Sequence, residues 1–209
     1  MALNDVWRNI NREIGIYWKG RFDQVPDVPG VYAWFYPLRI TTSELAVFLG
    51  DIAKLFSFDA ARNGLADGSA MLRFAWEEAG IDVKLRPTAS ALPADIIQIW
   101  NQVRTDPERF DRLRMVVMRG SLLMPPLYVG KARSLAVRCQ QHLTGTGKND
   151  FHERFQQYAA AAELSARVVE DLVFACIQTG EAVDNPDEAI EGLVEEILKR
   201  ACRPKYSAR

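Results

Sequence analysis

Apolar residues recur along this chain with two different periods, which predicts a fold that mixes strands and helices. Short runs rich in β-branched and aromatic residues predict three strands, at 30–36, 127–129 and 172–177. Helical spacing predicts helices at 3–14, 43–56, 69–79, 93–104, 107–119 and 151–162, after Gly130, and after 185. We therefore expect an α/β (α+β) fold in which a small three-stranded antiparallel sheet is flanked by helices.

The order of these elements divides the chain into three parts. An amphipathic helix, with Asn4 as its predicted N-cap, dominates an N-terminal extension at 1–24. The first two strands are separated by 37–124, whose helical patterns are interrupted by turn residues and whose charges balance. We interpret 37–124 as a large, mainly helical insertion, in which the run at 81–85 is a further candidate strand. The sheet domain then comprises 25–36 and 125–209.

Composition narrows the class of protein. The 209 residues are 48% hydrophobic and 25% charged, which is typical of a globular protein. No uncharged apolar run is long enough to cross a membrane, and no secretory core is present near the start, so we expect a cytoplasmic protein. The three cysteines, Cys139, Cys176 and Cys202, are too scattered for a zinc site and odd in number, which predicts reduced thiols.

The distribution of charge is more informative than the net charge of -1. Residues 128–158 contain five Lys or Arg and two acids, and 199–209 contain five Lys or Arg and no acid. The intervening stretch at 159–198 contains one basic residue and ten acids. Such polarity fits a local basic footprint for nucleic acid, although a run of charge is more often a solvated face.

The candidate chemistry gathers between 127 and 143. An apolar run that ends at Gly130 predicts a strand, a tight turn and then a helix, with Tyr128 closing the strand and Lys131 in the turn. Arg138 and His142 are four residues apart, so they share one face of the predicted helix. A phenol, an ammonium, a guanidinium and an imidazole in one place suit an anionic substrate.

This segment resembles the second signature of the GIY-YIG nuclease family, especially the nuclease subunit of bacterial excision repair and the family's restriction enzymes. Tyr128-Val129-Gly130 stands where the family has Y-I-G, and Lys131, Arg138 and His142 follow at the family's spacing. The run Pro29-Gly30-Val31-Tyr32 resembles the opening P-G-I-Y. The literal Gly15-Ile16-Tyr17 lacks strand alternation, and we interpret it as a decoy.

The C-terminal part resembles the end of the same family. Glu195 lies nine residues before Pro204, in register with the family's metal-binding glutamate, and it matches better than Glu196. The chain then reads Pro204-Lys205-Tyr206-Ser207 where the family has P-x-Y-N. Ser207 therefore replaces the usual Asn, and its hydroxyl reaches less far than an amide.

The resemblance implies a metal-dependent endonuclease that hydrolyses phosphodiester bonds in DNA. Tyr128 would be the general base with its pKa lowered by Lys131, Arg138 would clamp the phosphate, and Glu195 would hold one Mg²⁺ or Mn²⁺. Tyr32 and His142 would position water or phosphate and share the base role. The further residues expected to bind substrate are Arg133, Lys148 and Ser207.

Two other classes remain open from the sequence. The first is an inactive GIY-YIG-like relative that binds nucleic acid or protein, which the Ser207 replacement and the neutral insertion favour. The second is an unrelated α/β interaction protein in which the motifs are coincidental, because each residue alone is ordinary in its context. For 37–124 we expect no catalytic residue, but a role in widening the substrate groove or in a homodimer contact.

Overall fold

A computed structural model describes residues 13–40, 44–56, 67–73, 78–84, 92–146, 150–179, 188–202, 204 and 206. The chain divides into two compact units. The first comprises Met1–Leu38, Met118–Ala160 and Ser165–Arg209, and the second comprises Arg39–Val117 and Ala161–Leu164. The insertion predicted at 37–124 therefore overlaps the second unit over most of its length.

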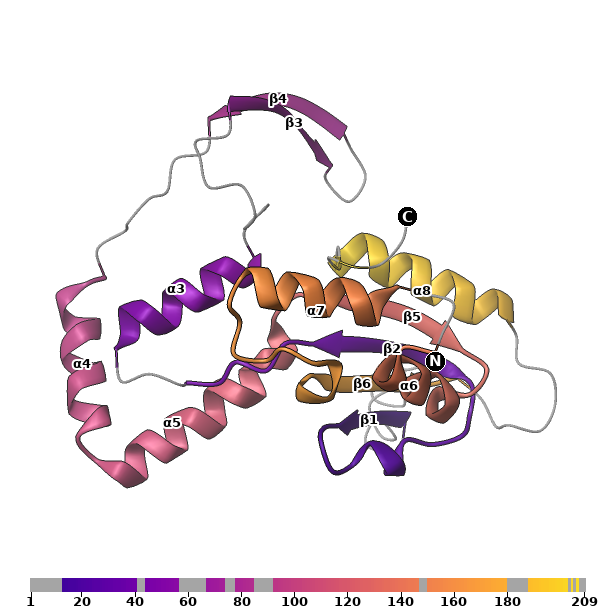
Figure 1. The fold of residues 1–209 in the computed structure, drawn as a ribbon, viewed down its shortest axis with the longest axis horizontal. Helices are drawn as coiled ribbons and strands as arrows, with labels where there is room; N and C mark the ends of the chain where they lie inside the picture. Colours follow the sequence, from indigo (N-terminus) through magenta and orange to yellow (C-terminus); the bar gives the residue numbers. More distant parts are fainter. Residues whose placement is uncertain are drawn as a thin grey trace, which may run out of the picture. The chain divides into compact units, whose positions relative to one another are not determined.

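The first unit is built on an antiparallel sheet of four strands, and Figure 1 shows them in the order β1-β6-β2-β5. The strands are β1 (Ile14–Tyr17), β2 (Gly30–Phe35), β5 (Tyr128–Ala132) and β6 (Val173–Gln178). The three predicted strands are confirmed, and β2 lies between the other two. The expectation of three strands was wrong by one, because β1 adds an edge.

Strand β1 corrects our interpretation of Gly15-Ile16-Tyr17. These residues pair with β6, with Tyr17 opposite Phe174, although they show no strand alternation in the sequence. Ile14 also lies in this strand and does not continue the predicted N-terminal helix. Glu13 is helical, and the rest of that predicted helix, at 3–12, lies outside the described residues. Tyr32, and not Tyr17, lies on the strand beside Tyr128.

The pairing of β2 with β5 brings the two signature tyrosines together. Tyr32 is opposite Gly130, and Trp34 is opposite Tyr128, so both tyrosine side chains point to the same face. The Tyr32 ring extends over Gly130, where an added Cβ would lie 2.5 Å from the Tyr32 hydroxyl. The glycine of Y-V-G is therefore required by the close approach of a side chain on the neighbouring strand.

Three helices complete the first unit: α6 (Leu135–Thr144), α7 (Phe151–Ala161) and α8 (Glu188–Cys202). Short 3₁₀ helices lie at η1 (Phe22–Gln24), η2 (Ser121–Leu123) and η3 (Val169–Asp171). The Ser134 hydroxyl caps α6 by accepting from the Val137 amide at 3.1 Å, and Gly145 ends it with φ 71°. Two local predictions were wrong: Tyr128 opens β5 and Lys131 belongs to that strand.

Helices α6 and α7 pack on the face that carries Tyr32, Trp34 and Tyr128. The buried residues Leu135, Cys139 and His142 of α6 and Phe151 of α7 fill the space above these rings. Lys131 alternates with Gly130, so its side chain leaves β5 on the opposite face. Its Nζ would lie 3.1 Å from a Cβ added at Gly192 of α8. Lys131 therefore reaches α8, and Tyr206, which follows α8, packs against Phe151 and Phe155 of the aromatic cluster.

The second unit contains three helices and a hairpin: α3 (Leu45–Phe56), α4 (Ala94–Arg104), α5 (Pro107–Gly120, whose last residues belong to the first unit), and the paired strands β3 (Asp67–Arg73) and β4 (Glu78–Lys84). Three predicted helices are confirmed. The helix predicted at 69–79 was wrong, because 69–73 belong to β3 and 78–79 belong to β4. The candidate strand at 81–85 corresponds to part of β4.

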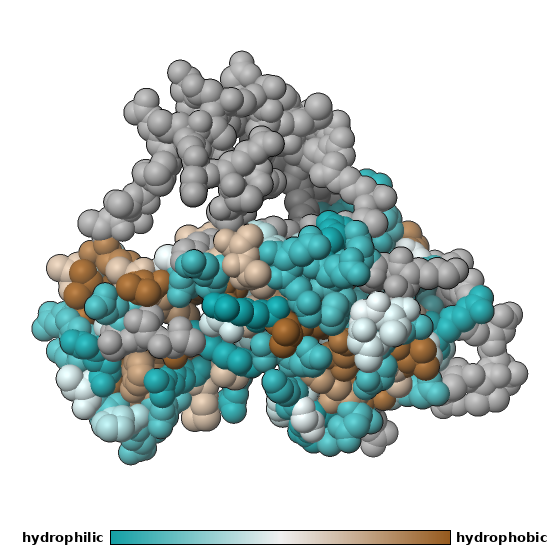
Figure 2. All heavy atoms as spheres, in the orientation of Figure 1, coloured by the Kyte–Doolittle hydropathy of each residue, from teal (hydrophilic) through white to brown (hydrophobic). Residues whose placement is uncertain are grey.

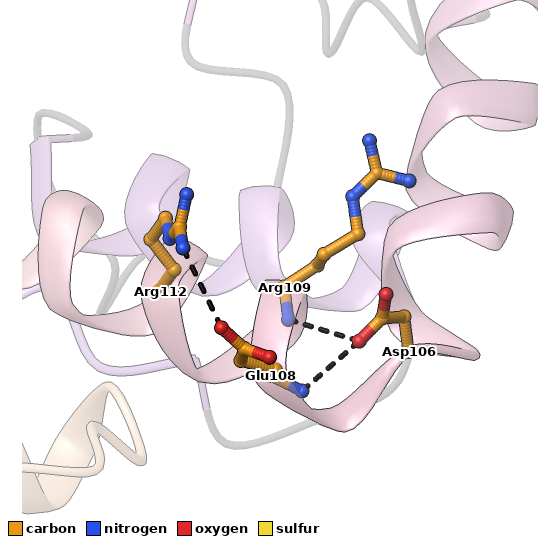
Figure 3. A network of polar contacts seen from close by, with 4 residues as sticks. All are labelled: Asp106, Glu108, Arg109 and Arg112. Atoms are coloured by element: carbon orange, nitrogen blue, oxygen red, sulfur yellow. Dashed lines mark hydrogen bonds and ion pairs between the residues drawn. The ribbon is translucent and has the colours of Figure 1, made fainter.

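The start of α5 is fixed by a side-chain cap. The Asp106 carboxylate accepts hydrogen bonds from the backbone amides of Glu108 and Arg109 at 3.1 and 3.2 Å (Figure 3). Pro107 occupies the first helical position, where no amide donor is needed. Glu108 also pairs with Arg112 at 3.6 Å, one turn later. These exposed charges stabilise the helix locally.

The surface mixes polar and apolar side chains, and Figure 2 shows small hydrophobic areas between larger hydrophilic ones on the visible face. On edge strand β1 and its neighbour β6, Ile14, Ile16 and Ile177 are 37 to 42% exposed. No helix in the described part of the chain has both the length and the apolar character to cross a membrane. The three cysteines are free, as predicted.

Candidate functional site

The Tyr32 hydroxyl is the centre of the site. Arg138 Nε donates to it at 3.1 Å, and His142 Nε2 lies 2.7 Å from it. Because a guanidinium only donates, the Tyr32 oxygen accepts from Arg138. The imidazole tautomer determines whether Tyr32 or His142 Nε2 donates in the second contact. Residues more than 100 positions apart meet at one oxygen.

The protonation states follow from burial. Tyr32 is 1% exposed, and burial, reinforced by the neighbouring Tyr128 phenol, raises the pKa of Tyr32 well above 10, although Arg138 opposes this. Burial, together with the charges of Arg138 and His152, lowers the pKa of His142 from 6.5 to about 3. At neutral pH the phenol is therefore protonated and the imidazole is neutral, so the contact between them joins two uncharged groups.

Arg138 is held in place by two partners from different elements. Its Nε donates to Tyr32, and its Nη1 donates to Gln141 Oε1 at 2.9 Å. Burial alone lowers the pKa of Arg138, but the Tyr32 and Tyr128 phenols more than compensate, so the pKa is raised and the guanidinium stays charged. The prediction that Arg138 and His142 share one helix face is confirmed by their common contact.

Tyr128 lies beside this group in an aromatic cage. Its ring is 5.9 Å from that of Tyr32, 5.2 Å from that of His142 and 5.1 Å from that of Phe151. Tyr128 is 9% exposed, so it is the more accessible of the two signature phenols. Among the described residues, His142 Nδ1 and Trp34 Nε1 have no hydrogen-bond partner, because aromatic rings surround them. The imidazole is therefore held in place by packing against the surrounding rings.

Lys131 and Glu195 belong to a second group, on one face of α8. Gly192, Glu195 and Lys199 are spaced by three and four residues, so they lie along one helix face. The ammonium of Lys131 lies at Gly192, and Lys199 Nζ is 2.8 Å from Glu195 Oε1. Strand β5 links the two groups, since Tyr128 and Lys131 are about 10 Å apart along it.

Three of the acids of α8, Glu191, Glu195 and Glu196, lie in different surroundings. Glu191 is 3% exposed and accepts a hydrogen bond from Thr179 Oγ1 at 2.6 Å. The Glu195 side chain is 16% exposed, whereas that of Glu196 is 54% exposed and pairs with Arg200 at 2.8 Å. Glu191 is buried and already hydrogen-bonded, and Glu196 is exposed to solvent. Glu195, half-buried and accessible, is the best placed of the three to bind a cation.

The donor set fits a hard cation bound through one carboxylate. Mg²⁺ typically takes one or two carboxylates from a protein and fills its remaining positions with waters and substrate oxygens. Within the part of the chain that the structure describes, no group of three or more His, Cys, Asp or Glu is arranged to hold a metal. A multi-ligand zinc-type site is therefore not supported here, while a single-carboxylate Mg²⁺ or Mn²⁺ site is chemically reasonable at Glu195.

The remaining predicted site residues contribute less. Arg133 is exposed in the turn between β5 and α6. Lys148 and Ser207 lie outside the described residues. The Nδ1 atom of His152 lies 2.8 Å from the His142 carbonyl oxygen in the last turn of α6.

Several residues of the site were not predicted. Gln141 and Lys199 lie three and four positions from Arg138 and Glu195, a spacing at which side chains on a helix are neighbours, so the sequence contained that signal. Gly192 and Phe151 approach the site from other elements. No local pattern indicates which strand a glycine faces or which ring closes a cage.

Compared with known proteins, the chain matches no family model, no curated protein and no solved structure. Its function must therefore be inferred from its own residues and their geometry.

Proposed function

We propose that this protein is a metal-dependent endonuclease of the GIY-YIG type that hydrolyses phosphodiester bonds in DNA. One observation carries the proposal: Arg138 and His142 of α6 meet the Tyr32 hydroxyl of β2, with Tyr128 of β5 stacked beside them. The sequence resemblance rests on spacing alone and does not require these contacts. Their occurrence at one oxygen favours a common chemical role over coincidence.

The charged Arg138 is suited to binding a phosphate. A guanidinium has five N–H donors, more than its contacts with Tyr32, Gln141 and the neighbouring Tyr128 phenol require. Those contacts also fix the plane of the fork, which reduces the entropy lost when a phosphate is bound. Arg138 would thus orient the scissile group and stabilise the negative charge that develops on it.

Tyr128 is the better candidate for the general base. The Tyr32 phenol is buried, protonated and already hydrogen-bonded to His142, so it acts as a positioning group and proton relay. The neutral His142 holds the Tyr32 hydroxyl from one side and Arg138 donates to it from another. Tyr128, at 9% exposure and next to the guanidinium, is better placed to meet an attacking water.

Glu195 would hold Mg²⁺ or Mn²⁺, which would supply charge neutralisation at the phosphate and at the leaving oxygen. Lys131, near the end of β5, and the exposed Arg133, directly after β5, add positive charge at this end of the strand. This charge would attract the DNA backbone from the β5 edge.

A cleavage assay on supercoiled plasmid DNA tests the proposal. We expect nicking or linearisation with Mg²⁺ or Mn²⁺, and none with EDTA or in Arg138→Ala. Arg112→Ala, which removes a guanidinium from an exposed ion pair on α5, is the matched control and should cleave normally. Salt-sensitive DNA binding without metal-dependent cleavage would instead identify an inactive binding module. Neither binding nor cleavage would favour an interaction protein.

A further inference from the structure

Lys199 and Glu195 form an ion pair that differs from its neighbour on the same helix. Lys199 Nζ lies 2.8 Å from Glu195 Oε1, and the two side chains are 23% and 16% exposed. One position along, Arg200 and Glu196 are also 2.8 Å apart, but their side chains are 56% and 54% exposed. The spacing and length are the same, so the difference is burial. Solvent and salt screen the Lys199–Glu195 pair less.

The position of the pair is informative. Glu195 is the residue assigned to bind the metal. One of its carboxylate oxygens is already in contact with the Lys199 ammonium. A divalent ion binds a carboxylate oxygen at about 2.0–2.1 Å. An ammonium at hydrogen-bond distance from the same oxygen would then lie within a few ångströms of the metal, where like charges repel strongly. Metal and Lys199 therefore compete for the Glu195 carboxylate.

We infer that Lys199 is an exchangeable counter-ion for Glu195, one that holds the carboxylate in position when no metal is bound and is displaced when a divalent cation binds. This inference rests on the proposed function, because it takes Glu195 as the metal ligand. Lys199 is a positioning residue: it sets the metal concentration at which the site fills. A flexible lysine stem suits this exchange, since its ammonium can turn away without moving the helix.

The geometry of α8 supports an exchange. Gly192 lies one turn before Glu195 and leaves room for the ammonium of Lys131, which comes from β5. Two lysine side chains, Lys131 and Lys199, therefore approach the helix face that carries Glu195. The two ammonium groups reduce the electrostatic cost of a charged Glu195 carboxylate when no metal is bound. The displaced Lys199 remains on the same face through its backbone position.

Mn²⁺ binding to the full chain, followed by the loss of the electron paramagnetic resonance signal of free Mn²⁺, tests the inference without any cleavage. Lys199→Met should bind Mn²⁺ about two- to fivefold more tightly than wild type, the range expected from a weak-to-moderate ion pair. Arg200→Met is the matched control and should bind like wild type. Lys199→Arg keeps the competing charge and should bind no more tightly than wild type.

The outcomes separate this inference from the proposed function. If Glu195→Gln binds Mn²⁺ as wild type does, the metal assignment itself is wrong. If Glu195→Gln loses binding while Lys199→Met equals Arg200→Met, only the role of Lys199 is overturned. Adding Lys199→Met to Glu195→Gln should have no further effect, because the pair is already broken. Detectable binding only in Lys199→Met would support the inference, and no binding in either would overturn it.

Discussion

The aromatic cluster on one face of the sheet and the charged face of α8 differ in burial and in how their polar groups are held. In the cluster, Tyr32 and His142 are 1% and 2% exposed, and each polar contact is enclosed by rings. On α8, the Glu195 and Lys199 side chains are several times more exposed and are joined by a simple ion pair. The first group is fixed before substrate arrives, whereas the second can exchange its partners. Precise geometry is thus combined with reversible metal binding.

The largest loss of cleavage is expected from a substitution at Glu195, on the charged face of α8. Glu195→Gln keeps the shape of α8 and removes the negative charge assigned to the metal, so cleavage should be lost while DNA binding persists. Glu196→Gln, at the exposed neighbour, should retain activity. Plasmid cleavage and a gel-shift titration measure both. A normal cleavage rate in Glu195→Gln, even when Glu191 or Glu196 is also replaced, would show that the metal site lies elsewhere.

Tyr128→Phe tests the fixed group. The ring and its stacking remain and only the phenol is lost, so the rate should fall by about 10² to 10⁴, as is typical when a general base is removed. Residual activity is expected if His142 takes over. In a Mn²⁺ titration this variant should bind like wild type, whereas Glu195→Gln should not. Equal metal affinities in the two variants would contradict the division into two groups.

The buried imidazole predicts how stability depends on pH. In the unfolded chain His142 takes up a proton below about pH 6.5, whereas in the folded protein its pKa is lowered to about 3. The unfolded state then binds more protons between these values, so stability falls as pH falls from 6.5 towards 3, by at most about 1.4 kcal/mol per pH unit.

His142→Gln should weaken this dependence because the amide does not titrate, and denaturant unfolding at several pH values measures it. His152→Gln leaves the buried imidazole in place and is the control. If the wild type and His142→Gln lost stability in parallel between pH 6.5 and 3, the folded imidazole would not be held neutral.

Gly130→Ala probes the packing that the cluster requires. Its methyl group would lie 2.5 Å from the Tyr32 hydroxyl, so the ring must shift, and we expect a loss of about 1–3 kcal/mol in the free energy of unfolding. Gly50→Ala lies within α3 with nothing within 4 Å, and should raise stability by up to about 1 kcal/mol. Urea midpoints distinguish the two. A neutral Gly130→Ala would mean that the ring has room to move.

The smallest effect is expected at Gly192. Alanine favours helix by about 0.5–1 kcal/mol, but its methyl group would lie 3.1 Å from Lys131 Nζ and push the ammonium aside. We expect Gly192→Ala to be slightly more stable and a few-fold slower in cleavage. Thermal unfolding and initial rates, compared with Lys131→Ala, test this. Unchanged cleavage in Gly192→Ala together with slow cleavage in Lys131→Ala would show that the position of the ammonium is unimportant.

The sequence predicted the parts of the molecule whose signals are local. The strand around Tyr32, the strand at 172–177 and the helix with Arg138 and His142 follow from period and turn residues, and each is confirmed. The hairpin of β3 and β4 was missed because a short mixed segment fits a helical period as well as a strand. Strand β1 was missed because four residues at an edge are stabilised by β6 and not by their own pattern.

The site divides in the same way. Spacing alone predicted that Arg138 and His142 share a face, but not that both contact Tyr32, since this depends on the register of β2 against β5. The pairing of Glu195 with Lys199 was open to prediction from their spacing, yet its burial was not, because neighbouring elements determine it. The general base, the metal and the DNA substrate stay predictions until they are measured.

The position of β2 has a consequence for how the chain folds during synthesis. Both hydrogen-bonding edges of this strand are filled by segments made later, β5 beginning at Tyr128 and β6 ending at Gln178. At about 5–20 residues per second, β2 would wait roughly 10–30 s after its own synthesis before both partners exist. Closing so long a loop costs little equilibrium stability, since each doubling of loop length adds about 0.6 kcal/mol. The insertion therefore imposes a delay more than an instability, and a nascent chain arrested between β5 and β6 would present a central strand with one unpaired edge to chaperones.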